Sequence, residues 1–580
     1  MKKALSLLLA VLLMVGLLAS CGNGEENPSA PTSTEPSAAP SYEAPVSIEP
    51  GDTEIELPLT EDEVTFDYWV TNSASFEDYS SFNDNLFYQW MEEQTGVHLN
   101  FIHPTVGSES ETFQTMILSN DYPDFISFFS NYYSGGVDKA INDGVLRRLN
   151  ELVDQYMPNY KAVVYRDEET FIRAISDSGN LWGVHHIVDY AQGAWLGLGV
   201  RSDWLDKAGL TLEDASTIDG MEKVLTAFKE YTYDNQGALF LSNGGLNVGG
   251  SICGSYGTGS VLSGGTRMLN VDGKVTYSPT QPGFKDYVAK MADWYAKGLV
   301  NANYIADARS YAAEDRWINS DIGLGEFVYT MAANFATLAA TNELYPQPDF
   351  HISALATPKL TADMDVSKDV HIRQTQELVR TNYSMGITTG CTDDEIELAC
   401  RYWDYVFSPD GVVASNWGPY EGEEGDVNAT YFVDPTDANG DGHVECYQPW
   451  LMEKCGTVTN VQYKVAAYMG PSYCIWSREW CALSEEEINY TKIWDTAGND
   501  WMWPGGVTLT ADEGTEASGI LSGCNTKVTE WTALVITGQK SVDTYETELI
   551  PDLESLNIAR AEELYQNALD RYMQRSQYLD

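Results

Sequence analysis

The sequence is poor in basic residues and lacks the paired cysteines of common metal and redox motifs. Its 580 residues hold 33 Lys and Arg against 86 Asp and Glu, a formal net charge of −53. Phosphate backbones and anionic lipids repel such a chain, which argues against nucleic-acid binding and against a basic membrane-binding patch. None of the nine cysteines forms a CxxC pair, so neither a zinc ribbon nor a thioredoxin-like motif is present.

Signatures of catalysis are also missing. The seven histidines form no HExxH motif, and the chain contains neither a GxSxG elbow nor a GxxxxGK[ST] phosphate loop. A glycosidase needs only two carboxylates roughly 5–10 Å apart, and many acidic residues leave room for such a pair. The missing motifs therefore weaken an enzymatic interpretation and leave a glycosidase as an alternative.

Long apolar runs are confined to the amino terminus. Two lysines precede Ala4–Ala19, which is almost continuously apolar but shorter than the roughly 20 residues of a membrane span. This layout is typical of a secretory signal. Leu18–Cys21 resembles the bacterial lipobox, which implies that Cys21 is acylated and becomes the new amino terminus. We expect residues 1–20 to be a signal peptide; an ordinary signal with an incidental cysteine is the alternative.

The segment after Cys21 has almost nothing that could form a core. Gly22–Gly51 consists largely of Pro, Ser, Thr, Ala and Glu, a composition that predicts an extended tether. We expect a linker over residues 21–60 and a globular body over 61–580. Without the signal the net charge becomes −55, so the lipid must hold the protein on the outer face of the cell membrane. Disulfides are permitted there among the other eight cysteines, and the sequence does not assign their pairing.

Hydrophobic periodicity predicts an α/β body. Val64–Val70 alternates as a strand, Leu86–Met91 has helical spacing, and Val97–Phe101 alternates again, which makes a βαβ unit with a parallel pair. Asp121–Ile126 opens a third strand. Gly244–Gly265 is expected to be a glycine-rich loop.

Helical stripes and end signals are clear in the second half of the body. One stripe comprises Phe284, Tyr287, Val288, Met291 and Trp294, ahead of a glycine cap at Gly298. Thr392–Glu395 is a capping box before a further helix. The last helix carries Ile558, Ala561, Tyr565, Ala568 and Tyr572 on one face.

Four stretches, in order, resemble the extracellular solute-binding proteins of bacterial ABC importers, in the large sugar-binding group. They are FQTMILSNDYPDFI (113–126), GLGVRSDWLDKAGL (197–210), DYVAKMADWYAKGLVNANY (286–304) and the closing segment 536–572. The resemblance implies two α/β lobes joined by a hinge that close on a solute in the cleft between them. We place the first lobe at 61–190 plus 365–415 and the second at 191–364 plus 416–580.

The resemblance also implies a function. A non-enzymatic, monomeric receptor, anchored through Cys21 and requiring no cofactor, would capture a solute and deliver it to an ABC permease. Tethering raises its effective concentration at the transporter. The alternatives are a surface carbohydrate-active enzyme, a receptor for basic peptides and a purely structural lipoprotein.

The aromatic content favours a sugar ligand. The chain has 16 Trp and 35 Tyr, whose rings stack on the apolar faces of sugars while carboxylates and amides bind the hydroxyls. The strongly negative charge would repel anionic ligands at long range. We therefore expect a neutral oligosaccharide.

The candidate ligand-binding residues are of three kinds: residues beside strand ends, residues of glycine-rich loops, and tryptophans. Each has a structural alternative, as a turn residue, a packed loop anchor or a core aromatic. Trp204 is expected to pack rather than to bind, and Trp503 belongs with the tryptophans that either line the cleft or fill the core. The ligand-binding candidates are Asn72, Asp124, Phe128, Glu326, Phe327, Trp417, Tyr420, Glu421, Trp476 and Trp501.

One loop resembles the first nine positions of a calcium loop, with oxygen ligands at positions 1, 3 and 5 and glycine at position 6. Gln448 stands where a bidentate Glu is expected, and the flanking segments are not clear helices. An acidic hairpin turn is the alternative, because Asn-Gly and Asp-Gly are strong hairpin signals. The candidate ligands of a structural Ca²⁺ are Asp437, Asn439, Asp441, His443 and Glu445.

Overall fold

The structure is a computed structural model that describes most of the chain from residue 51 onward. The described residues are 51–189, 194–241, 249–258, 267–306, 314–343, 345–372, 377–436, 443–468 and 470–579. The described residues all belong to one compact unit. The predicted signal peptide, Cys21 and the linker up to residue 50 lie outside the described residues.

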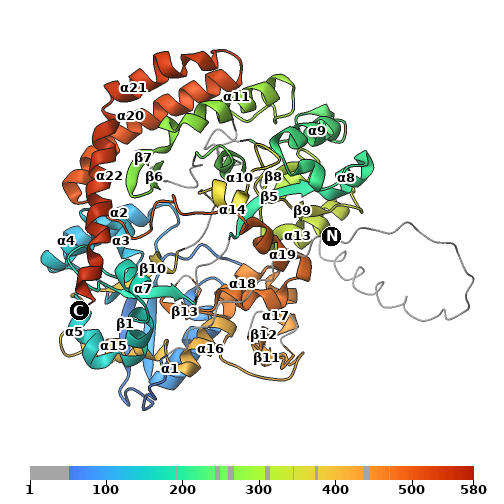
Figure 1. The fold of residues 1–580 in the computed structure, drawn as a ribbon. Coiled ribbons are helices and arrows are strands. Elements are labelled where there is room, and N and C mark those ends of the chain that lie inside the picture. The colour runs from blue at the N-terminus through green and yellow to red at the C-terminus, as the bar shows by residue number, and fades with distance from the viewer. Residues whose placement is uncertain are drawn as a thin grey trace, which may run out of the picture. The chain divides into compact units, whose positions relative to one another are not determined.

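A six-stranded sheet forms the centre of what we call the first lobe, which comprises residues 51–189 and 377–482 (Figure 1). Its spatial order is β13-β4-β10-β3-β1-β2. The β1–β2, β1–β3 and β4–β13 pairs are parallel, whereas β10 runs antiparallel to both β3 and β4. The strands are β1 (Val64–Trp69), β2 (Val97–Ile102), β3 (Phe125–Ser127), β4 (Val184–Val188), β10 (Val379–Ile387) and β13 (Ser472–Cys474).

The core of the first lobe is strongly aromatic. Tyr68 on β1 contacts Phe125 and Trp403 edge-on, with ring centroids 6.0 and 5.7 Å apart. A hairpin of β11 (Tyr431–Val433) and β12 (Glu445–Tyr447) adjoins this core. The helices of the lobe are α1 (Leu86–Thr95), α2 (Glu109–Ser119), α3 (Phe129–Tyr132), α4 (Gly136–Asn142), α5 (Asn150–Tyr156), α6 (Pro158–Val164), α7 (Glu168–Ala174), α15 (Ile396–Tyr405), α16 (Pro409–Trp417), α17 (Pro449–Cys455) and α18 (Val458–Val465).

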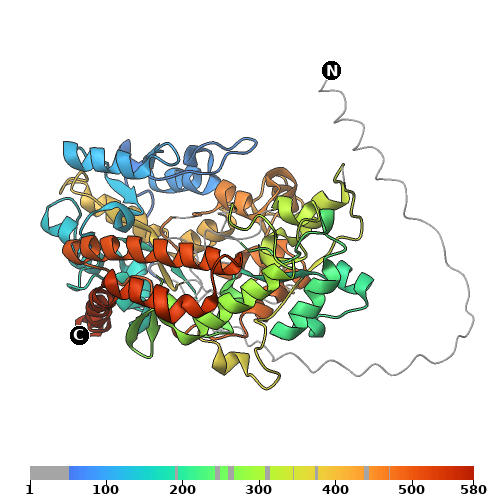
Figure 2. The same ribbon diagram turned by 90° about the horizontal axis from the view of Figure 1, so that it is seen from above.

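The second lobe, residues 194–372 and 483–579, is built around an antiparallel sheet of order β8-β5-β9. The long helix α20 lies beside α11, as Figures 1 and 2 both show. The strands are β5 (Leu196–Arg201), β8 (Leu324–Val328) and β9 (Ile352–Ala354), with a separate hairpin of β6 (Met268–Val271) and β7 (Lys274–Tyr277). The helices are α8 (Ser202–Ala208), α9 (Ile218–Phe228), α10 (Gly249–Gly254), α11 (Pro282–Ala296), α12 (Glu314–Ile318), α13 (Ala332–Ala340), α14 (Val366–Asp369), α19 (Glu485–Trp494), α20 (Ala511–Ile536), α21 (Ile550–Ser555) and α22 (Ile558–Met573).

The boundaries between the lobes differ from those expected. Residues after 415 were assigned to the second lobe, yet Trp417, Leu451 and Val461 lie in the core of the first. The reason is β13, which pairs with β4 and so draws the chain up to Cys474 into the first sheet. The return to the second core occurs only with α19.

The start of the body also differs from the prediction, because residues 51–60 were expected to belong to the linker. The Thr53 N–H donates to the Asn159 side-chain oxygen at 2.9 Å. The Leu59 N–H donates to the carbonyl of Thr95 at 3.0 Å. Backbone hydrogen bonds to the first lobe therefore begin before residue 61.

Most elements predicted from periodicity are confirmed. The βαβ unit is β1-α1-β2, and the buried stripes of α11 and α22 contain the residues expected. Three details differ. β3 begins at Phe125 rather than Asp121, and α15 begins at Ile396, after the predicted capping box Thr392–Glu395 rather than within it. The expected loop Gly244–Gly265 contains α10. The rest of that loop lies largely outside the described residues.

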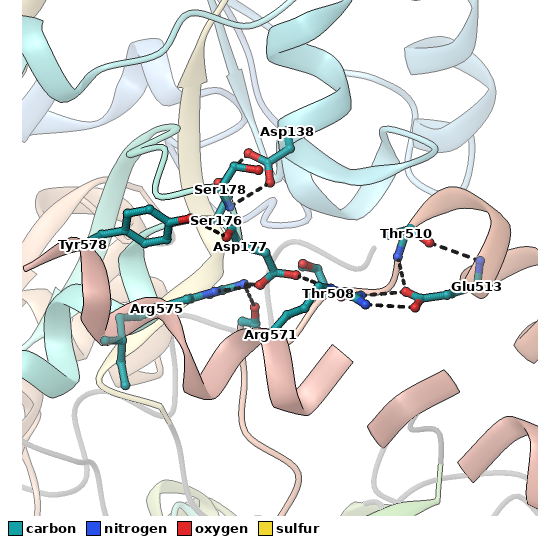
Figure 3. A network of polar contacts seen from close by, with 12 residues as sticks. Asp138, Ser176, Asp177, Ser178, Thr508, Thr510, Glu513, Arg571, Arg575 and Tyr578 are labelled. Atoms are coloured by element: carbon teal, nitrogen blue, oxygen red, sulfur yellow. Dashed lines mark hydrogen bonds and ion pairs between the residues drawn. The ribbon is translucent and has the colours of Figure 1, made fainter. Parts of the chain in front are cut away.

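The carboxyl-terminal helix of the second lobe is joined to the first lobe by an ionic network (Figure 3). Asp177, which follows α7, accepts from Arg571 Nε at 3.0 Å and from Arg575 Nε at 2.8 Å. Arg571 also pairs with Glu513 at the start of α20, at 2.6 Å. The network therefore connects α7, α20 and α22.

The cysteines and the helices bear on two further expectations. All eight cysteines from Cys253 onward are free thiols in the structure, although the sequence permits disulfides. Within the described part of the chain, no helix is both long and apolar enough to cross a membrane.

Candidate functional site

The candidate site lies at the edge of the first sheet where the parallel strands end. β4 and β13 run parallel, so their carboxyl ends reach the same edge, and antiparallel β10 begins there. Ligands of open α/β sheets bind outside the carboxyl ends of the strands. Trp476 follows β13 at this edge, and Arg380 is the second residue of β10.

A cavity of about 110 Å³ opens between this edge and the sheet of the second lobe. The second lobe contributes residues at the start of β5 and at the end of β8, which share one edge because the two strands are antiparallel. The lining residues are Trp195, Val328, Tyr329, Thr330, Arg380, Thr459, Gln462, Tyr468, Cys474, Trp476, Arg478 and Glu479. Both lobes therefore supply aromatic and polar groups to one cavity.

Arg380 brings a positive charge to the cavity. An irregularity in the β10–β4 pairing separates Arg380 from Met385, and such bulges re-aim side chains. The guanidinium lies 5.8 Å from the ring of Tyr383 and makes no hydrogen bond or ion pair with the described residues; its Nε is buried. Burial is the main cause that lowers the pKa of Arg380, and the nearby Arg478 adds to it.

Arg478 brings a second positive charge, and Asn416 holds it in place. Asn416, on α16, accepts from the N–H of Ile475 at 2.8 Å and from Arg478 Nη1 at 3.2 Å. Its amide group donates to the carbonyl of Tyr473 at 2.9 Å. Arg478 Nη1 also contacts the Cys474 sulfur, while the buried Nε has no partner in the described structure. The guanidinium is thus held through Nη1, and its Nε donor is unused.

Glu479 is the acidic residue of the cavity lining. Its Oε2 accepts from Gln462 Nε2 at 3.0 Å. Burial raises the pKa of Glu479 to about 8, so the side chain is mostly a neutral carboxylic acid at pH 7. It therefore does not neutralise the two arginines under those conditions.

His186 and Tyr383 lie behind this part of the cavity. His186, paired with Arg380 in the sheet register, bonds through Nδ1 to the carbonyl of Gly470 at 2.9 Å. Burial, followed by the charge of Arg380, holds the pKa of His186 well below its usual value. The imidazole is therefore neutral and adds no further positive charge.

The chemistry of the cavity is that of binding. Trp195 and Trp476 supply aromatic surface, which suits the apolar faces of sugars. The arginines, Gln462 and Glu479 supply hydrogen-bonding groups. The lining therefore combines aromatic rings with a larger number of polar and charged side chains, which suits a small polar ligand.

The residues predicted after the first strands lie at two different ends of the sheet. Phe128, after β3, contacts the ring of Tyr383 edge-on with centroids 5.9 Å apart. Asn72, after β1, donates to the carbonyl of Ser80 at 3.0 Å within its own loop. Asp124 was placed at the carboxyl end of the third strand, but it precedes β3 and accepts from the Asp67 N–H at 2.7 Å. It therefore lies at the opposite edge from the cavity.

The residues predicted on β8 are buried beside the cavity rather than in its lining. Phe327 is fully buried against Tyr490 and Trp494, with ring centroids 5.6 and 5.3 Å away. Glu326 is 2% exposed. It is the next residues along the strand and after it, Val328 and Tyr329, that line the cavity.

The aromatic and acidic candidates near residue 420 lie away from the cavity lining. Trp417 is 2% exposed in the core of the first lobe, with its ring centroid 5.5 Å from that of His443. Tyr420 accepts through its carbonyl from Thr430 N–H at 2.7 Å. Glu421 is exposed and accepts from the Tyr431 hydroxyl at 3.3 Å. These contacts anchor the loop to β11.

Of the later tryptophans, Trp476 lines the cavity, and its ligand contact stays a prediction. Trp501 stacks on His371 with centroids 4.1 Å apart and donates to Asp272 at 3.3 Å. Trp503 contacts Tyr565 edge-on. Trp204 packs as expected, with the Arg201 guanidinium 4.5 Å from its ring.

The predicted calcium loop is only partly described. Asp437, Asn439 and Asp441 lie outside the described residues. His443 lies beside Trp417, and Glu445 begins β12. Among the described residues, no group of three or more His, Cys, Asp or Glu side chains could hold a metal ion.

Sequence reasoning missed the charged residues of the cavity. Arg380 and Arg478 are far apart in the chain and come together because β10 pairs with β4 next to β13. Arg478 and Glu479 lie two and three residues after the predicted Trp476. The sequence did contain a signal for these residues. Basic residues are scarce in this acidic chain, so an arginine within an aromatic stretch is unusual.

The chain resembles a known transport protein in sequence. No family model matches the chain. The chain is 26% identical over 357 residues to the fructooligosaccharide ABC transporter substrate-binding protein FusA of Streptococcus pneumoniae; the alignment covers 58% of this chain and 60% of that protein. It therefore spans about three fifths of the length of this curated relative.

Solved structures establish the fold. An extracellular solute-binding protein from Bifidobacterium longum subsp. infantis superposes with a TM-score of 0.67 at 14% identity, covering 88% of this chain and 98% of that one. The alginate-binding protein AlgQ2 gives a TM-score of 0.63 at 20% identity over 88% and 99% of the two chains. The chain thus has the two-lobed α/β fold of solute-binding proteins, and the resemblance seen in the sequence is confirmed.

Proposed function

We propose that this protein is a non-enzymatic receptor that binds an oligosaccharide and delivers it to an ABC import permease. The single observation that carries the proposal is the cavity between the two sheets, lined by Trp195 and Trp476 and by hydrogen-bonding side chains from both lobes. A ligand held by both lobes favours the closed arrangement, which a permease can distinguish from the open one.

The similarity to FusA supports the oligosaccharide part of this proposal, since that relative is named for fructooligosaccharides. The cavity itself supports binding over turnover. Glu479 is the acidic residue of the described lining and is largely protonated at neutral pH. A glycosidase needs two carboxyl groups at the scissile bond, and this lining supplies one. A receptor for basic peptides is disfavoured, because Arg380 and Arg478 would repel lysine and arginine side chains.

Calorimetry against a panel of oligosaccharides, with product analysis of the same mixtures, tests the function. We expect saturable binding without turnover. Trp476→Ala should weaken binding by about tenfold or more, by analogy with stacked aromatic contacts worth about 1–3 kcal/mol. The control Trp501→Ala, outside the cavity lining, should leave affinity unchanged. Released products, or no binding to any member of the panel, would contradict the proposal.

The lipid anchor is a second part of the proposal, which the lipobox-like sequence Leu18–Cys21 supports. Cys21→Ser should leave the protein unprocessed or released into the medium, because the thiol that carries the lipid is gone. Fractionation of cells and metabolic labelling with a fatty acid measure this. A Cys21→Ser protein that remains both processed and membrane-bound would show that another segment anchors it.

A structural calcium ion at residues 437–445 stays a prediction from the sequence. The spacing of Asp437, Asn439 and Asp441 supports it. The AlgQ2 structure is described as lacking calcium, which associates that protein with the ion.

A further inference from the structure

Two arginines line the interlobe cavity and have no carboxylate partner among the described residues. Arg380 and Arg478 both line it, and neither forms an ion pair among the described residues. The groups that act on the pKa of Arg380, after burial, are Cys474, Tyr383, Arg478 and Tyr468, none of them a carboxylate. Arg478 is buried and Arg380 is half-buried. A charge withdrawn from water without a partner is costly, so a stable fold keeps it only where something else compensates it.

The nearby acidic groups do not supply that compensation. Glu479 bonds to Gln462 and is mostly neutral at pH 7. Asp189, at the end of β4, accepts from the N–H of Trp476 at 3.4 Å. Neither carboxylate lies within ion-pair distance of a cavity arginine.

The unused donors point to what is missing. The terminal Nη atoms of Arg380 make no hydrogen bond with the described residues and are the donors that a ligand could reach, because the Nε atoms of Arg380 and Arg478 are themselves buried without an acceptor. Guanidinium groups present planar sets of donors that match carboxylate and sulfate oxygens better than they match isolated hydroxyl groups. Two such groups lining one cavity suit an anion.

We propose that the cavity recognises an anionic group on the sugar, a carboxylate or a sulfate, through Arg380 and Arg478. The proposal rests on the oligosaccharide receptor function above and specifies its substrate class as acidic sugars. It departs from the neutral ligand expected from the net charge. At physiological salt, charges more than about 8 Å apart on the surface are largely screened, so two arginines inside the cavity outweigh distant surface carboxylates.

Paired ligands give the sharpest test. The probes are a trisaccharide of uronic acids, the same trisaccharide with each carboxyl reduced to an alcohol, and a sulfated disaccharide with its unsulfated parent, each in several backbone types. Calorimetry should show at least tenfold tighter binding of the charged member of a pair. The uronate and sulfate arms tell which anion the site accepts.

Variants then assign the effect to the arginines. Arg380→Gln should cost at least tenfold in affinity for the charged sugar and little for its neutral partner, and Arg380→Lys should retain part of the affinity. Arg401→Gln is the matched control, since Arg401 lies on α15 outside the cavity lining with a long 3.9 Å contact to Glu397. Equal affinity for both members of every pair, or no effect of Arg380→Gln, would overturn the proposal.

The outcomes separate this proposal from the function on which it rests. If neutral sugars bind and charged ones do not, the anion site is wrong while the receptor function stands. If no sugar binds, the receptor function fails and the acidic-sugar proposal falls with it.

A melt without ligand adds a readout that does not depend on finding the right sugar. Because Arg380 has no ion-pair partner among the described residues, Arg380→Met should raise Tm by about 1–2 °C in a chain of this size. A fall in Tm would show that Arg380 has a structural role and would contradict the proposal.

Discussion

At the scale of single residues, Asp404 is a buried carboxylate whose role is structural. It lies on α15, 1% exposed, and accepts from the Tyr160 N–H at 2.8 Å and from Asn159 Nδ2 at 3.0 Å at the start of α6. Burial, partly offset by these hydrogen bonds, raises its pKa to about 6. Asp404 therefore holds its proton in the folded state at pH values where the unfolded chain has lost it.

The sign of the pH effect follows from this shift. The unfolded pKa is 3.8 and the folded pKa about 6, so the native state binds more protons within that window. The contribution of Asp404 to the free energy of unfolding is complete below pH 4 and is lost as the pH rises to about 6. The upper bound on that loss is about 3 kcal/mol, at 1.36 kcal/mol per pKa unit.

Asp404→Asn should flatten the pH dependence of stability between pH 4 and 6, since the amide does not titrate. Urea denaturation of both proteins at pH 4, 5, 6 and 7 measures the difference in slope. Asp394→Asn, at an exposed position on the same segment, is the control and should retain the wild-type profile. Parallel profiles for wild type and Asp404→Asn would show that Asp404 is not the group that titrates.

Two tryptophans show what the sequence alone could not decide about single residues. Trp476 was predicted as one of several tryptophans that could line the cleft, and the structure places it in the cavity lining. Trp417 was predicted from its glycine-rich loop, with Tyr420 and Glu421 beside it, and it is core. Neither local sequence distinguishes a tryptophan of the lining from one of the core. What decides between them is which strand end it follows, and β13 is only three residues long.

At the scale of elements, periodic segments were predictable because one buried face fixes them. The stripe from Phe284 to Trp294 on α11 is buried as expected. The capping box at Thr392 shows the limit. Glu395 Oε2 accepts from the Thr392 N–H at 3.0 Å as predicted, but the helix proper starts only at Ile396. The short strand β13 gave no such signal, because three residues cannot establish a period.

Two helical glycines should respond oppositely to the same substitution. Gly519 lies on an exposed part of α20, where an added Cβ would meet nothing within 4 Å. Gly519→Ala should therefore raise stability by about 0.5–1 kcal/mol, because alanine restricts the unfolded chain more. Gly283, on α11, lies against the Tyr256 carbonyl oxygen, and a Cβ there would overlap it. Gly283→Ala should lower stability by about 1–3 kcal/mol.

Chemical denaturation of the two glycine variants and the wild type compares them directly. Each variant serves as the control for the other, since the residue change is identical and both sites are helical. A stabilised Gly283→Ala protein would mean that α11 shifts to accommodate the methyl group.

At the scale of the whole molecule, the ionic network around Asp177 connects elements of both lobes (Figure 3). Arg575 is 1% exposed and donates to Asp177 through Nε and Nη2, and to the carbonyl of Gly506 at 2.9 Å. Because the guanidinium is buried, loss of its carboxylate partner leaves a charge without compensation.

Asp177→Asn should lower the free energy of unfolding by about 3 kcal/mol. The comparison is Glu516→Gln, which removes the partner of Arg560 in an exposed pair and should cost less than about 1 kcal/mol. Denaturation in guanidinium, followed by tryptophan fluorescence, measures both. Similar small losses for the two variants would show that the Asp177 network is no stronger than a surface pair.

The two-lobed fold could be inferred as a class from sequence resemblance, whereas the course of the chain through it could not. The assignment of 416–580 to the second lobe failed because β13 returns to the first sheet. Strand pairing between residues hundreds of positions apart leaves no local trace. The same pairing brings Arg380 and Arg478 together, so the fold boundary and the charge of the cavity were missed for one reason.

The position of β10 also sets the order in which the protein can acquire its structure. β10 lies between β3 and β4, and β13 completes the far edge of the same sheet. A chain emerging from its amino terminus therefore makes β3 and β4 long before the strand that separates them exists. Until then both strands expose backbone groups that other chains could pair with. The first sheet therefore cannot be complete until β13, near residue 474, has been synthesised.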